Sequence, residues 1–123
     1  MKIGQVAADA GVSVDTVRFY ERRGLLPAPS RRPSGYREYQ PSTVERIRMA
    51  RVMQSLGLTL DEIVDALAAH DAGTATCESE RWRLEGVLDR IDGRIADLRR
   101  TRRLVTATLR DCRGGRCRLT GIG

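Results

Sequence analysis

Residues 77–112 of this chain read CESERWRLEGVLDRIDGRIADLRRTRRLVTATLRDC and contain no proline. Their large aliphatic residues recur mostly in alternating steps of three and four, which is typical of a helix packed lengthwise on a partner helix. This aliphatic seam consists of Leu84, Leu88, Ile91, Ile95, Leu98, Val105 and Leu109, with Arg102 at the one position that it skips. The alternative is a long helix packed within its own chain, but little sequence remains to cover it. We therefore predict that the helix pairs with a second copy of the chain.

Cysteines stand at both ends of this predicted helix. Because an α-helix rises about 1.5 Å per residue, Cys77 and Cys112, which are 35 positions apart, lie roughly 50 Å from each other. They cannot bind one ion within a single chain. In an antiparallel homodimer, however, Cys77 of one subunit lies beside Cys112 of the other.

The charges of the helix favour the same pairing modestly. Residues 77–94 hold five acidic and four basic side chains, and residues 95–112 hold two acidic and five basic ones. Antiparallel pairing sets a charge of −1 against +3, whereas parallel pairing of the second halves sets +3 against +3.

Composition separates a basic head from an acidic middle. The chain has 123 residues and a net charge of +6, with +4 in residues 1–50, −5 in residues 51–98 and +7 in residues 99–123. This distribution is typical of a nucleic-acid-binding head on a separate body. No pair of residues suggests catalysis, so we do not expect an enzyme. No signal peptide or membrane-spanning run is present, and three cysteines do not make a disulfide framework, so we expect a cytoplasmic protein.

The first fifty residues have the pattern of a winged helix-turn-helix. Apolar spacing predicts a helix over residues 3–10, a glycine turn, and a second helix that is capped by Ser13 and closes at Gly24. Residues 25–29 contain two prolines and cannot be helical. The basic, tyrosine-bearing segment 30–40 then predicts a hairpin that turns at Ser34 and Gly35.

Two further helices connect this head to the long helix. Ser42 to Glu45 reads as a capping box, and the apolar residues that follow predict a helix up to Gly57. Thr59 to Glu62 reads as a second capping box, opening a helix to about His70.

In combination, these segments resemble the MerR family of bacterial transcriptional regulators, in its metal-responsive mercury, zinc, cadmium and lead branch. The resemblance rests on IGQVA at residues 3–7, VSVDTVRFYE at 12–21, GLL at 24–26 and GYREY at 35–39. It covers residues 1–70 and continues into the long helix. It implies a mainly α fold with a winged helix-turn-helix domain with connecting helices (1–70), an antiparallel coiled-coil dimerisation helix (71–111) and a metal-binding loop and tail (112–123).

The resemblance also implies which residues contact DNA. They are Thr16, Val17, Arg18 and Tyr20 on the recognition helix and Tyr36 and Arg37 in the wing. We also expect Arg31 to contact DNA, through a sequence-independent and salt-sensitive attraction. Arg18 would reach into the major groove, and Tyr20 would hold a phosphate. Tyr36 and Arg37 would grip the flanking backbone, while Phe19 would face the core. Arginine can pair bidentately with guanine, and tyrosine hydroxyls position a protein without reading sequence.

A thiolate metal site is the second expected function. Cys117 follows Cys112 after a segment with two glycines, which allow a tight turn, and flanking arginines favour the thiolate. Together with Cys77 from the partner they make three sulfur ligands, which suit Hg(II) best. Zn(II), Cd(II) and Pb(II) remain alternatives. Zinc prefers four ligands, and His70, an aspartate or water could complete that set. The segment between Cys112 and Cys117 is shorter than in the usual family members.

The sequence thus predicts a homodimeric regulator that binds an inverted repeat in promoter DNA. The resemblance implies that metal binding distorts the promoter so that RNA polymerase can engage, in the bacterial cytoplasm at the nucleoid. One rival hypothesis is a thiol-redox switch, in which Cys112 and Cys117 form a disulfide. The other is a metal buffer for which DNA binding is incidental. An iron–sulfur cluster needs four clustered cysteines, and the chain has three.

Overall fold

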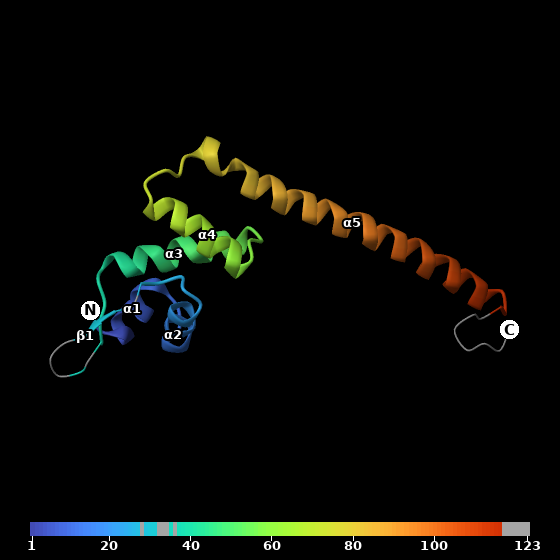
Figure 1. Cartoon of the computed structure of the whole chain (residues 1–123). Coiled ribbons are helices and arrows are strands. Elements are labelled where there is room, and N and C mark those ends of the chain that lie inside the picture. Colours follow the sequence, from blue (N-terminus) through green and yellow to red (C-terminus); the bar gives the residue numbers. More distant parts are fainter. Residues whose placement is uncertain (28, 32–34, 36, 117–123) are drawn as a thin grey trace. The chain divides into compact units, whose positions relative to one another are not determined.

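The computed structural model describes residues 1–27, 29–31, 35 and 37–116, with Ser30 and Arg31 described by their backbone. It contains two compact units, of which the first is Met1–Leu84 and the second begins at Glu85. The fold is mainly α, as the sequence predicts. Figure 1 shows the helices in chain order, from α1 in blue to α5 in orange and red.

The helix-turn-helix forms as the sequence predicts. Helix α1 spans Ile3–Ala10, and helix α2 spans Val14–Arg22. Gly11 ends α1 with a φ of 70°, a left-handed conformation that glycine adopts without strain. The Ser13 side chain accepts a hydrogen bond of 3.1 Å from the Thr16 backbone N–H, which confirms the predicted N-cap of α2.

A short hairpin follows α2. Strands β1 (Ser30–Arg31) and β2 (Arg37–Glu38) pair antiparallel, with Ser30 opposite Glu38. Gly35 has a φ of 86° between them. The predicted wing is therefore present in the fold.

Helix α3 (Ser42–Ser55) corrects one detail of the sequence analysis. Its N-cap is Pro41, which makes no side-chain cap, so the capping box predicted at Ser42 is absent. Pro41 already has helical angles, with a φ of −56°. Ser42 therefore lies inside the first turn, and the Gln40 and Pro41 carbonyls accept from the Thr43 and Val44 N–H groups.

Helix α4 (Leu60–Asp71) begins with the predicted capping box. The Thr59 hydroxyl accepts from the Glu62 N–H, and the Glu62 carboxylate accepts from the Thr59 N–H at 2.8 Å. The core of this unit lies among α1 to α4. Its most deeply buried side chains are Val6, Val17, Leu25, Ile47, Ile63 and Leu67.

Helix α5 runs from Cys77 to Arg113, so the long helix predicted from the aliphatic seam is confirmed. Its own chain leaves the seam uncovered, because all seven seam side chains are between 41% and 66% exposed. The helix ends in a Schellman turn, in which the Arg116 N–H donates to the Asp111 carbonyl and Gly115 has a φ of 80°. The chain thus turns sharply just after Cys112.

The division after Leu84 differs from the boundary expected at residue 70. The first two turns of α5 belong to the first compact unit, because Arg83 and Leu84 line a groove together with side chains of α3 and α4. Within the described residues, no helix has the length and apolar character needed to cross a membrane.

Two glycines inside α5 give a test of this helix. A methyl group added at Gly86 or Gly93 would meet no atom within 4 Å. Each Gly→Ala substitution is therefore expected to raise the free energy of unfolding by about 1 kcal/mol, measured by thermal or urea unfolding. Gly115→Ala is the control and should destabilise, because its φ is positive. A loss of stability in Gly86→Ala or Gly93→Ala would contradict an open outer face.

Candidate functional site

The outer face of α2 presents a small polar surface. Arg18 is exposed and forms a loose ion pair with Asp15 at 3.7 Å. Thr16 is partly exposed, and its hydroxyl shares a hydrogen bond of 2.9 Å with that of Ser13. An exposed ion pair contributes little to stability, so the Arg18 guanidinium remains available to a nucleic acid. Thr16 and Arg18 stay as predicted DNA contacts.

Two other predicted contacts lie in the core instead. Val17 and Tyr20 are buried, with exposed fractions of 0% and 3%. The Tyr20 hydroxyl donates to the Gln54 side chain of α3 at 2.8 Å, so it already has a partner within the chain. Phe19, which was expected in the core, is half-buried and lies near the guanidinium groups of Arg22 and Arg23. The inner face of α2 therefore passes through Val17 and Tyr20.

A carboxylate on α2 anchors the wing, and the sequence analysis did not assign it this role. Glu21 accepts from the Arg37 guanidinium at 2.9 Å and, through its other oxygen, from the hydroxyl of the buried Tyr39. Burial, followed by the hydrogen bond to Glu21, raises the pKa of Tyr39. Arg37 is thus fixed beside α2. Tyr36 and the Arg31 side chain lie outside the described residues and remain predictions.

Arginines of α3 bind the head itself. Arg51 donates to the Ala10 and Gly11 carbonyls, and Arg48 donates to the Asp9 carbonyl at 3.0 Å. These cations satisfy carbonyls at the negative end of α1. Arg46 donates to the Leu25 carbonyl and forms a bidentate pair with Asp71 at 2.6 and 2.9 Å. Part of the positive charge of the head is therefore structural.

The described cysteines occupy opposite ends of α5. Cys77 is its first residue and is exposed, whereas Cys112 is the residue before its last and is partly exposed. Cys117 lies outside the described residues. In the described part of the chain, no three His, Cys, Asp or Glu side chains gather closely enough to hold a metal ion. One continuous helix cannot bring Cys77 and Cys112 of the same chain together.

An apolar groove of about 470 Å³ opens beside Cys77. Its walls come from α3, α4 and the start of α5, and they include Met49, Met53, Leu56, Leu84 and His70. His70 is exposed at the end of α4. The groove is continuous with the exposed seam, because Leu84 belongs to both.

Known families match nearly the whole chain. The model described as "MerR HTH family regulatory protein" matches residues 1–70, which is more than half of the chain. The chain belongs to the MerR family. A second model, "MerR, DNA binding", matches residues 44–108 of this MerR-family chain.

Among the relatives, a "Mercuric resistance operon regulatory protein" of Bacillus cereus is 38% identical over 85% of this chain and 79% of its own length. The solved structure of the transcription regulator PbrR691 from Ralstonia metallidurans CH34, in complex with lead(II), has a TM-score of 0.83 and 30% identity, and the match covers 90% of this chain and 87% of that one. The MerR of Bacillus megaterium MB1 in complex with mercury(II) has a TM-score of 0.67 and 33% identity, with 89% and 85% covered.

The Glu21–Tyr39 contact in this MerR-family head predicts a pH dependence of stability. Because the folded-state pKa of Tyr39 is raised, the unfolded chain loses this proton first. The free energy of unfolding should therefore fall as pH rises from about 10 through the raised pKa. Tyr39→Phe should remove that part of the fall, as measured by urea unfolding at pH 8 and above pH 10. Equal pH dependence in the variant and the wild type would contradict the contact.

Proposed function

We propose that this MerR-family chain is a metal-responsive transcriptional regulator that binds an inverted repeat in promoter DNA as an antiparallel homodimer. Its inducer is a soft divalent metal ion, with Hg(II) favoured. Each ion is held by Cys77 of one subunit and by Cys112 and Cys117 of the partner subunit. The bound ion supplies a bridge of metal–thiolate bonds between the two chains.

The observation that carries this proposal is the unbroken helix α5, with an exposed seam and a cysteine at each end. In the register that places Cys77 beside the partner's Cys112, Leu84 faces the partner's Val105. Further along, Ile91 faces the partner's Leu98. One register thus buries aliphatic side chains and gathers the sulfurs at both ends of the dimer. Each buried aliphatic side chain stabilises such an interface by about 1.5–3 kcal/mol before the entropic costs of association.

The ligand set favours Hg(II) among the possible ions. Three thiolates without a carboxylate or imidazole match a soft ion. Similarity to two mercuric resistance operon regulatory proteins, at 38% and 37% identity, points the same way. Lead is the second candidate, because the structure of PbrR691 with lead(II) has a TM-score of 0.83. Zn(II) would need a fourth ligand. His70, which lines the same groove as Cys77, is the nearby imidazole for that set. Cd(II) remains a further alternative.

Regulation follows from where the ion joins the chains. An ion between Cys77 and the partner's Cys112 and Cys117 would fix the start of one α5 against the end of the other. The two heads would then be held at a spacing that bends and untwists the promoter, so that RNA polymerase can engage. Because binding free energies are linked, promoter DNA and metal must change each other's affinity by the same factor.

Arg18 gives a test of the DNA-binding half of the proposal. Arg18→Ala should weaken binding to duplexes that the wild type selects from a randomised inverted-repeat pool, because one base contact contributes about 1–3 kcal/mol. Fluorescence anisotropy against a scrambled duplex measures the change. Arg103→Ala, which removes one exposed arginine from α5, is the control and should retain specific binding. Unchanged specificity in Arg18→Ala would remove this residue from the recognition surface.

A heterodimer tests the shared metal site. One chain carries Cys77→Ser, and the other carries both Cys112→Ser and Cys117→Ser. Neither homodimer has a complete site, whereas the heterodimer has one complete end. We expect the purified heterodimer to bind one Hg(II) tightly, measured by thiolate-to-metal absorption under reducing conditions.

Two outcomes would overturn the shared site. A heterodimer that binds no more tightly than either parent would refute the antiparallel arrangement. Tight binding by the Cys77→Ser homodimer would show that Cys77 is not a ligand. Running the same titration with Pb(II), Cd(II) and Zn(II) ranks the ions, and a response that needs oxidant instead of metal would favour the redox hypothesis.

A further inference from the structure

The first turn of α5 is tied to α4 by hydrogen bonds on the side of the connecting segment. The Thr76 hydroxyl accepts from the Ser79 N–H, and the Ser79 hydroxyl accepts from the Thr76 N–H, each at 2.9 Å. The Ser79 hydroxyl also donates to the Thr74 carbonyl, and the Thr74 N–H donates to the Ala69 carbonyl of α4. The turn that begins with Cys77 therefore has a defined position against α4.

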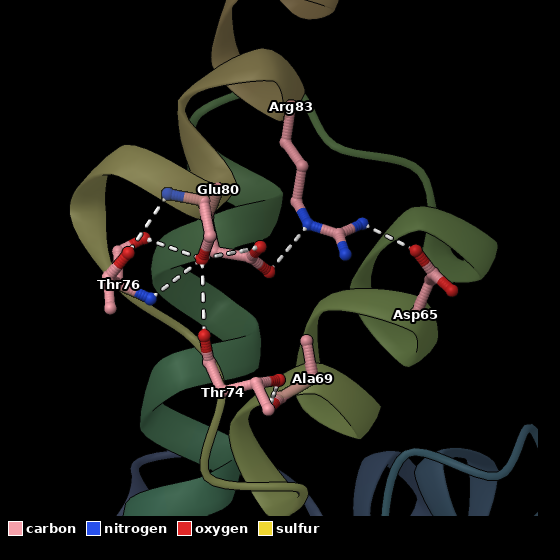
Figure 2. Close-up of polar contacts among 7 residues, drawn as sticks. Asp65, Ala69, Thr74, Thr76, Glu80 and Arg83 are labelled. Atoms are coloured by element: carbon pink, nitrogen blue, oxygen red, sulfur yellow. Dashed lines mark hydrogen bonds and ion pairs between the residues drawn. The ribbon is translucent and has the colours of Figure 1, made fainter.

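Arg83 makes the second tie, and it joins two helices directly. Its Nη1 donates to Asp65 of α4 at 2.7 Å, and its Nε donates to Glu80 of α5 at 3.0 Å. Figure 2 shows the guanidinium reaching from α5 toward Asp65, with Glu80 on its other side. The Arg83 side chain is only 10% exposed, so these charge-assisted hydrogen bonds are less screened than surface pairs. A guanidinium fork can hold both carboxylates at once, which a lysine ammonium does less well.

Arg83 leaves the dimer seam free. The seam passes through Leu84 and Leu88, whereas Arg83 turns its side chain toward α4. Glu80 lies one helical turn after Cys77, and Arg83 lies one turn after Glu80. Arg83 thus contacts α4, whereas Leu84 and Leu88 remain at least half exposed in the single chain.

Helix α4 also contacts the end of the recognition helix through one exposed ion pair. Asp61, one turn before Asp65, accepts from Arg23 at the end of α2 at 3.2 Å. Residues four apart lie on one face of a helix. On this face of α4, Asp61 binds Arg23 at the end of α2, and Asp65 binds Arg83 of α5. Both contacts lie within the first compact unit, Met1–Leu84. A shift of the first turn of α5, which begins with Cys77, would therefore act on α4, the helix that Arg23 contacts.

We propose that Arg83 is the positioning residue through which metal bound at Cys77 acts on the DNA-binding head. This proposal rests on the proposed function and names the contact that regulates it. Arg83 is neither a proposed metal ligand nor a proposed DNA contact. It holds the first turns of α5 to Asp65, so that fixing Cys77 in a metal site moves α4 and, with it, the end of α2. A ligand shifts an equilibrium only through contacts that differ between two states, and in this proposal the Arg83–Asp65 pair transmits such a difference from the start of α5 to α4.

The experiment measures coupling on the full-length dimer. The dissociation constant for Hg(II) is determined by competition with a small dithiol, with and without an operator duplex selected by the wild type. The ratio of the two constants reports the coupling, which is typically about 5- to 150-fold in allosteric proteins. The variants are Arg83→Gln, Arg83→Lys and Asp65→Asn, and Arg103→Gln is the matched control for loss of one arginine.

We expect Arg83→Gln and Asp65→Asn to bring the ratio within about twofold of one, while Hg(II) still binds the DNA-free dimer. Arg83→Lys should retain part of the coupling, because an ammonium can still pair with Asp65. Arg103→Gln should keep the wild-type ratio. The Hg(II)-induced fluorescence change of a base analogue at the operator centre should follow the same order.

Each other result has a defined meaning. A merely structural role for Arg83 would lower thermal stability and leave the ratio unchanged, which would overturn the proposal. If Arg83→Gln does not fold, Asp65→Asn decides alone, since Asp65 is exposed and Arg83 keeps its ion pair with Glu80. A changed ratio in Arg103→Gln would mean a general charge effect and would also overturn it. A wild-type dimer that binds no Hg(II), or whose ratio is one, would refute the proposed function itself.

Discussion

An aliphatic seam that its own chain cannot cover is the constraint on which this molecule depends. Helix α5 is 37 residues long, and all seven of its seam side chains are exposed in the single chain. The hydrophobic effect favours burying such a seam, and a second copy supplies a surface of matching length. A helix of this length also separates its two cysteines. The feature that calls for a partner therefore also divides the proposed metal site between two subunits.

The first compact unit solves a different problem, which is how to hold short elements rigid. Helices of eight and nine residues are too short to be stable alone. Long side chains from α3 and α2 hold them in place. Arg51 satisfies carbonyls at the end of α1, and Glu21 fixes both Tyr39 and Arg37 of the wing. The partly exposed Thr16 and the exposed Arg18 thus project from a framework that is held by internal ion pairs and hydrogen bonds.

The sequence predicted those parts of the fold that local chemistry determines. The Ser13 cap, the capping box at Thr59 and the extent of α5 follow from residues that are close in the chain. The capping box predicted at Ser42 was wrong, because Pro41 is the N-cap and Ser42 is already the first helical residue. Val17 and Tyr20, two of the predicted DNA contacts, are buried, whereas Phe19, expected in the core, is half-buried.

Contacts between distant residues were not predictable in the same way. Glu21 with Tyr39 and Arg83 with Asp65 join elements far apart in the sequence, and charges of both signs are common along the chain. Glu21 and Tyr39 do stand in the segments that carry the family resemblance, which is a signal that could have drawn attention to them. Arg83 had no comparable signal. Its role emerges only when α4 and α5 are placed side by side.

The ion pairs that arginines form within the head also affect how the protein responds to ionic strength. Residues 1–50 hold nine basic residues, but Arg37, Arg46 and Arg48 already pair with carboxylates of their own chain. Only cations that neutralise phosphates displace condensed counterions, each contributing about −0.9 to the slope of log K against log salt on duplex DNA. The measured slope should therefore count the arginines that face outward. The number of basic residues in the head therefore overestimates how strongly added salt lowers its affinity for DNA.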